Sequence, residues 1–153
     1  MRVWRAEPDE AATVAGLIRE FGEWFGNSAP ARDEIRASVE RIMAGADGEF
    51  LLGAADDSPE AAGICQLRFR WSVWKSAEDC WLEDLFVRED ARRSGLGRAL
   101  VEAALERARD RGCKRAELDV NERNAAALAL YEACGFQLEW KPPGRSLFIG
   151  RAL

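Results

Sequence analysis

The chain has 153 residues, of which 48% are hydrophobic and 32% are charged, a composition typical of a soluble globular protein with a core of its own. Its formal net charge of −5 disfavours nucleic acid as a partner, and the lack of histidine excludes Ser-His-Asp and Cys-His catalysis. The N-terminal residues lack the apolar stretch of a secretory signal, and no apolar run is long enough to cross a membrane. We therefore expect one cytoplasmic domain over residues 1–153.

The four cysteines lie far apart in the sequence and form no C-x-x-C pair. A disulfide framework or a zinc site needs closer and more regular spacing. We therefore expect free, buried thiols at Cys65, Cys80, Cys113 and Cys134, and no metal site.

The first half of the chain predicts a strand, two helices and two further strands. Residues 2–6 alternate as in a short strand. The apolar residues after Pro8 recur at helical spacing up to Gly26, and a second helix follows that ends near Gly45. The two strands after it are predicted at 49–54 and 62–71.

The second half predicts a strand, a helix, a strand, a helix and a closing pair of strands. The strand at 81–87 is followed by a turn and by a helix that runs from Leu96 to Gly112. The remaining elements are predicted as a strand at 114–120, a helix at 124–134, and strands at 136–140 and 146–152. This order indicates a mixed α/β layered domain in which residues 81–120 form a strand–helix–strand crossover.

The turn at residues 92–97 has the sequence Arg-Arg-Ser-Gly-Leu-Gly. The first turn of a helix leaves backbone amides without partners, and the helix dipole places partial positive charge there. Glycines at 95 and 97 lack the Cβ atoms that would keep a bulky anion away from those amides. The pattern predicts a phosphate site, although a glycine pair at a helix start is by itself often only a tight turn.

A second pattern lies at residues 120–136. Asn124 is a suitable N-cap for an alanine-rich helix, and Tyr131 follows about two turns later on the same face. Tyr131 is also the only tyrosine of the chain. The alternative to a catalytic role for Tyr131 is that of an ordinary helix aromatic packed on the sheet.

Together the two patterns resemble those of the GNAT acetyltransferase superfamily. The family's acetyl-CoA motif, R/Q-x-x-G-x-G/A, is matched between Arg92 and Gly97. Its later motif, N-x-x-A-x-x-x-Y-x-x-x-G-F, is matched at Asn124, Ala127, Tyr131, Gly135 and Phe136. The resemblance implies a GNAT-like fold, with a central mixed sheet flanked by helices and with the strands at 81–87 and 114–120 splayed apart around acetyl-CoA.

The resemblance also implies roles for individual residues. Backbone groups of the strand end would pair with pantetheine, the amides of the turn would hold the pyrophosphate, Asn124 would touch the pantetheine, and Tyr131 would protonate the leaving thiolate. The cofactor-binding residues implied in this way are Leu85, Phe86, Val87, Arg92, Arg93, Ser94, Gly95, Leu96, Gly97, Arg98, Asn124 and Tyr131.

An amine acceptor must lose a proton, and Glu83 is the candidate base, acting directly or through water. An acid within a central strand is unusual, and burial would raise its pKa. Strand alternation places Glu83 on the same side as Leu85 and Val87 and places Asp84 on the other, unless a bulge swaps them. Glu83, Asp84 and a water chain stay open as the base, and both acids could instead face solvent.

Aromatic and basic residues receive mostly structural interpretations. Trp4, Trp24, Trp81 and Trp140 are predicted as core or interface aromatics. In the strand at 62–71, Leu67, Phe69 and Trp71 alternate with polar residues and are expected on its buried face, and Trp71 and Trp74 could line an acceptor pocket. Solvated positions are expected for Arg88, Arg107, Arg109, Arg111 and Arg115.

We therefore expect an N-acetyltransferase that moves the acetyl group of acetyl-CoA to a primary amine in a ternary complex, with Tyr131 and Glu83 as catalytic residues. A non-catalytic acyl-CoA-binding module of the same fold is the alternative. The partners expected are acetyl-CoA and a small amine or a protein amino group, with neither nucleic acid nor a membrane, and a homodimer is possible. The identity of the acceptor cannot be inferred from the sequence.

Overall fold

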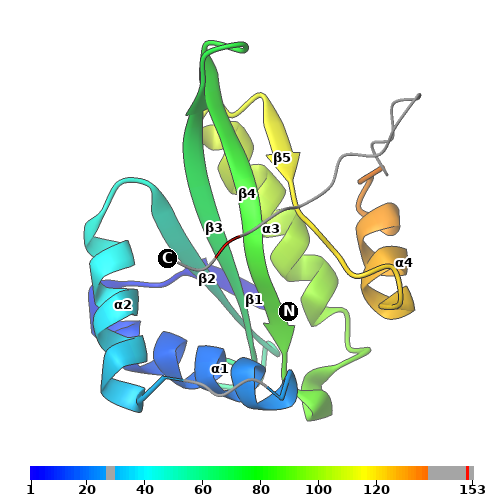
Figure 1. Ribbon diagram of the computed structural model, residues 1–153. Coiled ribbons are helices and arrows are strands. Elements are labelled where there is room, and N and C mark those ends of the chain that lie inside the picture. Colours follow the sequence, from blue (N-terminus) through cyan, green and yellow to red (C-terminus); the bar gives the residue numbers. More distant parts are fainter. Residues whose placement is uncertain (27–29, 138–150, 152–153) are drawn as a thin grey trace.

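The computed structural model describes residues 1–26, 30–137 and 151, and it shows a five-stranded sheet with helices on both faces (Figure 1). The strands lie in the order β1-β2-β3-β4-β5; β5 runs parallel to β4, and the other neighbours are antiparallel. The strands are β1 (Arg2–Arg5), β2 (Gly48–Ala54), β3 (Gly63–Ser72), β4 (Ala77–Val87) and β5 (Arg115–Glu117). The expected mixed α/β fold is confirmed.

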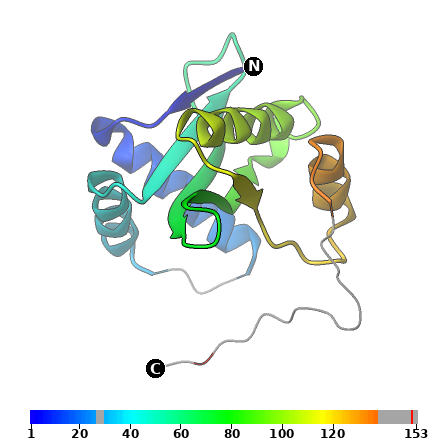
Figure 2. The same ribbon diagram turned by 90° about the horizontal axis from the view of Figure 1, so that it is seen from above.

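In the described part of the chain, three α-helices pack on the sheet and a fourth packs against α3; two of the four are preceded by a 3-10 turn. The helices are α1 (Ala11–Trp24), α2 (Arg32–Ala44), α3 (Leu96–Asp110) and α4 (Ala125–Ala133), and the turns are η1 (Pro8–Glu10) and η2 (Glu89–Ala91). Helices α1 and α2 pack on one face and α3 on the other, as the view from above shows (Figure 2). None of the helices in the described ranges is long and apolar enough to span a membrane.

Alternation along β2 divides the core into two halves. Phe50 and Leu52 pack toward α1 and α2, whereas Leu51 packs toward α3. All seven residues of β2 are buried, because this strand has a helix layer on each side. β2 therefore contributes side chains to both halves of the core.

Helix α3 lies very close to the sheet. A Cβ atom at Gly53 would come within 2.9 Å of Leu96 Cδ1, and one at Gly63 within 2.9 Å of Leu100 Cδ1. Two neighbouring strands therefore need glycine beneath the first turns of α3. This contact fixes the N-terminus of α3 relative to the end of β4, where the predicted site lies.

Strands β4 and β5 separate soon after they meet. Within the described residues they pair only where Asp79–Trp81 lies beside Arg115–Glu117, and β4 then continues to Val87 paired with β3 only. The predicted strand at 114–120 is thus shorter than expected, since β5 ends at Glu117. The expected splay is confirmed, and α4 lies across the gap from β4 (Figure 1).

The hairpin between β3 and β4 is longer than predicted. β4 begins at Ala77, so part of the expected loop at 75–79 is strand, and the tip of the hairpin stands clear of both helix layers (Figure 1). Trp71 belongs to this tip and is 65% exposed, so its predicted burial is wrong. The predicted strands at 136–140 and 146–152, with Trp140, lie almost wholly outside the described residues.

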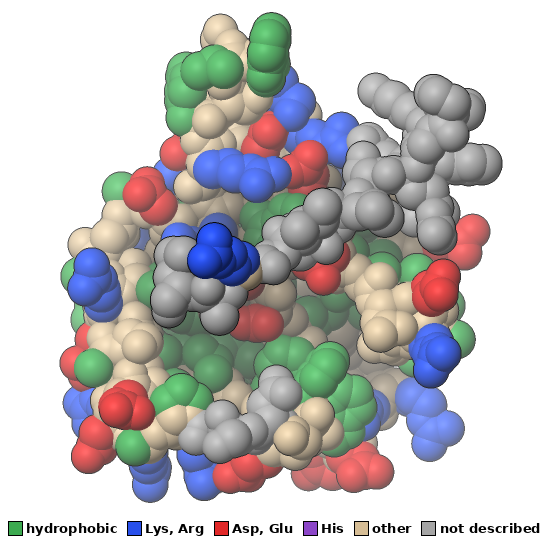
Figure 3. All heavy atoms as spheres, viewed as in Figure 1, with side chains coloured by type: hydrophobic (Ala, Val, Ile, Leu, Met, Phe, Trp, Pro, Cys, Tyr) green, Lys and Arg blue, Asp and Glu red, His purple; other side chains and the backbone are tan. Residues whose placement is uncertain are grey.

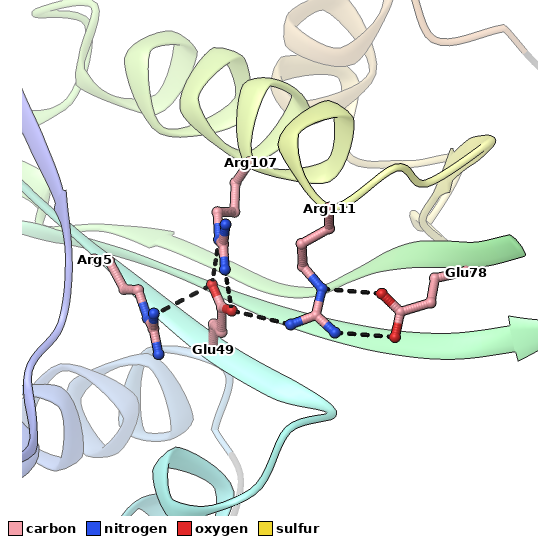
Figure 4. A network of polar contacts seen from close by, with 5 residues as sticks. All are labelled: Arg5, Glu49, Glu78, Arg107 and Arg111. Carbon is pink, nitrogen blue, oxygen red and sulfur yellow. Dashed lines mark hydrogen bonds and ion pairs between the residues drawn. The ribbon is translucent and has the colours of Figure 1, made fainter.

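A charged network lies beneath the C-terminal end of α3 (Figure 4). Glu49 on β2 is only 5% exposed and receives two 2.7 Å hydrogen bonds from Arg107 and one of 3.2 Å from Arg111. Arg111 also binds Glu78 through two hydrogen bonds, and Arg5 lies 3.7 Å from Glu49. The predicted solvation of Arg107 and Arg111 is therefore wrong, because both compensate a buried carboxylate.

Candidate active site

The turn before α3 is open, and several of its amides are free. Gly95 is the N-cap with φ +96°, and Arg93 also has a positive φ, +59°. A Cβ at Gly95 would meet nothing within 4 Å. Within the described residues, the backbone amides of Gly97 and Arg98 have no hydrogen-bond partner. Such amides, at the positive end of the helix dipole, suit a phosphate group.

Gly97 lies where α3, β4 and α4 approach one another. A Cβ built on it would lie 3.5 Å from Leu130 of α4 and 3.8 Å from Val87 of β4, which are ordinary contact distances. The free amides of the turn therefore border the gap between β4 and α4. Gly95 is thus free of neighbours, whereas Gly97 is half-buried beside Leu130 and Val87.

The hydrogen-bond ladder shows which groups of β4 face this gap. The amide of Arg88 donates to the carbonyl of Ala62 on β3 at 2.9 Å. Since antiparallel ladders alternate, the backbone groups of Phe86 point toward β3, whereas those of Leu85 and Val87 point away from it. Two of the three strand residues predicted to bind pantetheine can thus offer backbone groups to the gap.

Arg92 is hydrogen-bonded to one of those outward backbone groups. Its Nε donates to the carbonyl oxygen of Val87 at 3.0 Å, and its guanidinium carbon lies 4.7 Å from the centroid of the Trp24 ring. The amide of Val87 is left without a partner among the described residues. Trp24 is 54% exposed, at the end of α1, so it borders this region and is not a core residue.

A β-bulge in β4 places Glu83 differently from the predicted alternation. Gln66 of β3 faces Asp84 while Leu67 faces Leu82, which leaves Glu83 as the extra residue. Glu83 Oε2 lies 3.4 Å from Gln66 Nε2 and 3.7 Å from an Arg68 nitrogen. Its predicted position on the side of Leu85 and Val87 is therefore wrong.

The pair of acids at the bulge combines an exposed group with a more buried one. Glu83 is exposed, whereas Asp84 is half-buried. Burial, and then the negative charges of Glu83 and Asp119, raise the pKa of Asp84 above its ordinary value. The expectation that burial would tune the pKa of an acid on this strand therefore applies to Asp84.

The helix α4 carries the second predicted motif. Asn124 caps it, with Oδ1 accepting a 3.1 Å hydrogen bond from the amide of Ala127. Tyr131 stands edge-on against Phe136, with ring centroids 5.8 Å apart, and packs beside the α3 half of the core. The Tyr131 hydroxyl makes no hydrogen bond to any residue in the described part of the chain.

The surroundings of Tyr131 keep it protonated. Burial, followed by the nearby groups of Cys65, Asp119, Cys134 and Asp84, raises the pKa of Tyr131 to about 12. The hydroxyl is therefore a proton donor throughout the neutral pH range. Burial likewise raises the pKa of the Cys80 thiol to about 12, which argues against a cysteine nucleophile on this strand.

On the face shown in Figure 3, hydrophobic and acidic side chains line a hollow between the side of α1 and α2 and the side of α4. The described residues thus include free amides at the start of α3, a protonated tyrosine on α4 and two carboxylates on β4. The sequence matches the model of the acetyltransferase (GNAT) family over residues 14–136.

The chain belongs to this family.

Its relatives support the same conclusion. The chain is 31% identical to an aminoglycoside N(6')-acetyltransferase type 1 of Stenotrophomonas maltophilia, with 87% of this chain and 84% of that protein covered. It is 29% identical to the thialysine N-epsilon-acetyltransferase of Bos taurus, with 86% and 81% covered.

Solved structures agree with this fold. A structure from Arthrobacter sp. FB24 has a TM-score of 0.86 and 34% identity, over 100% of this chain and 96% of that one. The structure of AAC(6')-Iy in complex with the bisubstrate analogue CoA-S-monomethyl-acetylneamine has a TM-score of 0.81 over 99% and 98% of the two chains; at 19% identity it supports the fold alone. The protein is an N-acetyltransferase of the GNAT family.

Some features of this GNAT site were not evident from the sequence. The contact of Arg92 with Val87 and Trp24 depends on where α1 ends, and no local pattern marks it. Trp74 is 94% exposed at the hairpin tip, and the structure does not place it or Trp71 among the site residues. No group of three or more His, Cys, Asp or Glu side chains in the described ranges could hold a metal ion.

Proposed function

We propose that this protein transfers the acetyl group of acetyl-CoA to the primary amine of a small cationic acceptor, by direct attack within a ternary complex. The observation that carries the proposal is that free amides of the helix start and of the strand end border one gap. The free amides of Gly97 and Arg98 suit the diphosphate, and the outward backbone groups of Leu85 suit the pantetheine arm, whereas the Val87 carbonyl is already bonded to Arg92. Asn124 lies on the opposite side of the gap, on α4.

The protein groups then have distinct roles in acetyl transfer. The Val87 amide would stabilise the negative charge that develops on the thioester oxygen as the new C–N bond forms. Tyr131 would donate its proton to the sulfur as the C–S bond breaks. Its raised pKa means that the proton is present on Tyr131 throughout the neutral pH range.

The acids at the bulge would remove the proton of the amine. We propose Glu83 as the group that meets the incoming ammonium, because its side chain is exposed and lies beside those of Gln66 and Arg68. Asp84 is the second carboxylate, and burial with the nearby negative charges raises its pKa, which favours its acceptance of a proton. A relay through water connects either acid to the amine.

The acceptor proposed here follows from charge. Two carboxylates beside the gap, in a protein of net charge −5, favour a cationic amine over an anionic one. The names of the two curated relatives also point to amine acceptors, a lysine analogue in one and an aminoglycoside in the other. We also propose a single domain over residues 1–153; the homodimer and the cytoplasmic location stay predictions.

The direct test is calorimetric titration with acetyl-CoA, followed by turnover with a panel of polyamines, amino acids, aminoglycosides and peptides. Failure to bind acetyl-CoA at millimolar concentration would end the proposal. Binding without turnover of any acceptor would favour the non-catalytic acyl-CoA-binding module instead.

The role of Tyr131 is tested by Tyr131→Phe. Loss of a general acid lowers kcat by about 10²-fold or more, while KM for acetyl-CoA stays close to that of the wild type. The hydroxyl has no described partner, so the thermal unfolding midpoint is expected to stay unchanged. Undiminished kcat would remove the acid role.

A further inference from the structure

Two arginines hold the last turns of α1 against the end of β4. Arg88 forms two hydrogen bonds of 2.7 Å with the carboxylate of Glu20 and a third, of 3.2 Å, with the carbonyl of Ala61. Arg92 lies on the ring of Trp24. Glu20 and Trp24 are four residues apart and share one face of α1, so the two arginines grip successive turns. The predicted solvation of Arg88 is therefore wrong.

The second contact of Arg92 is with the backbone at the reacting end of β4. The peptide plane that joins Val87 to Arg88 is held from both sides. Its N–H donates to Ala62 at 2.9 Å, and its C=O accepts from Arg92 at 3.0 Å. Without Arg92, the Val87 carbonyl would face the gap uncovered, and its negative end would lie beside the position where negative charge develops.

These contacts direct the Arg92 guanidinium away from a simple role as a phosphate ligand. Its Nε is used by Val87, and its plane lies near the Trp24 ring. Arg93, by contrast, is exposed on the turn itself with its backbone in the left-handed region. Arg98 is paired with Glu102 at 2.7 Å. Of these three, Arg93 is the side chain most available to an anion.

We propose that Arg92 is a positioning residue that acts through Val87. It holds the Val87 carbonyl in place and compensates the partial negative charge of the carbonyl oxygen. The neighbouring Val87 amide then keeps its direction into the gap. Through Trp24 it also sets the last turn of α1 relative to the same strand end. The proposal rests on the proposed function for its kinetic consequence but not for its structural one.

The kinetic test compares Arg92→Met, which removes the donor and the charge, with Arg92→Gln, which keeps a donor. We expect Arg92→Met to lower kcat about tenfold or more and to change KM for acetyl-CoA only slightly, because transition-state stabilisation is lost. Arg92→Gln should recover most of kcat. Arg93→Met is the matched variant on the same turn, and we expect it to raise KM for acetyl-CoA in a salt-dependent way.

A structural readout separates this proposal from the proposed function. In the ligand-free protein, Arg92→Met should speed hydrogen exchange at the Arg88 amide, whose peptide plane it releases, whereas Arg93→Met should not. Trp24→Leu should affect kcat less in the Arg92→Met background than in the wild type, since the two residues are in contact. Thermal unfolding of each variant checks that it is folded.

Two results would overturn the proposal. A rise in KM for acetyl-CoA with unchanged kcat in both Arg92 variants would make Arg92 a phosphate ligand. Unchanged kcat together with unchanged exchange at Arg88 would show that the contacts position nothing. A wild-type protein without turnover would defeat the proposed function, yet the exchange experiment would still decide whether Arg92 holds the strand end.

Discussion

The two ends of α3 differ in how their backbone and side chains are satisfied. At the C-terminal end, Arg107 and Arg111 place positive charge where the helix dipole is negative, and buried Glu49 binds both (Figure 4). At the N-terminal end, Gly95 and Gly97 leave amides free and facing a gap. One helix thus has a closed end that stabilises the fold and an open end that can receive an anion.

Substitutions at the C-terminal end of α3 should lower the free energy of unfolding most. Glu49→Gln leaves two arginines without their buried counter-charge, and loss of one partner of a buried ion pair costs about 3–5 kcal/mol of the free energy of unfolding. Urea unfolding measures this directly. The variant should still bind acetyl-CoA when folded, because the network lies at the opposite end of the helix from the glycine turn.

The control for Glu49 is an exposed pair. Arg36 and Glu40 form an ion pair on the surface of α2, and Glu40→Gln should cost only about 0.5 kcal/mol or less. Burial by itself raises the pKa of Glu49, but Arg107, Arg5 and Arg111 bring it below its ordinary value. The ion pairs of Glu49 therefore stabilise the fold at pH values above the ordinary carboxyl pKa. This stabilisation is lost as pH falls through the lowered pKa of Glu49. Equal losses in the two variants would contradict the comparison.

Substitutions at the N-terminal end of α3 should change the affinity for acetyl-CoA more than the stability of the fold. Gly97→Leu places a large side chain where α3, Val87 and Leu130 meet, and we expect the acetyl-CoA Kd to rise about tenfold or more, or by at least 1.4 kcal/mol. Gly97→Ala adds only a methyl group at ordinary contact distance, so its Kd should stay near that of the wild type. Calorimetry measures the acetyl-CoA affinities of the wild type and of the two variants.

A second glycine provides the matched control for helix stability. Gly16 lies within α1, and a Cβ there would meet nothing within 4 Å. Gly16→Ala should stabilise the protein by about 1 kcal/mol through helix propensity and leave acetyl-CoA affinity unchanged. If Gly16→Ala weakened binding as much as Gly97→Leu, the site would not be specific to the start of α3.

The acids at the bulge give a smaller effect, seen in pH dependence. Glu83→Gln removes a negative charge that raises the pKa of Asp84, so that pKa falls. If Asp84 accepts the proton, the acidic limb of the kcat/KM profile moves to lower pH in this variant. If Glu83 alone is the base, activity is lost at all pH values and the limb does not move.

The smallest effect is expected at the hairpin tip. Trp74 is 94% exposed, and no described contact of its ring connects it to the gap. Trp74→Ser should leave the unfolding midpoint and the acceptor KM unchanged. A clear rise in acceptor KM would instead support the predicted role of this aromatic in an acceptor pocket.

Local sequence patterns predicted one end of α3 and not the other. The glycine turn was evident from the sequence, because the demand for small residues and free amides concerns neighbours in the chain. The network at the other end was not, since Glu49 and Arg107 are 58 positions apart and each looks like an ordinary surface charge. The sequence left a bulge between Glu83 and Asp84 open, and only the register between β3 and β4 decided it.

The sequence by itself determined the order of the elements as far as α4, the N-cap at Asn124, the helix started by Gly95 and the family's two motifs, because each depends on residues within a few turns of one another. Only the tertiary structure decided how Glu83 and Asp84 face, which strand groups reach the gap, and that Arg92 touches both Val87 and Trp24. Those outcomes depend on packing between distant segments, where burial and pairing set the charge and direction of each group.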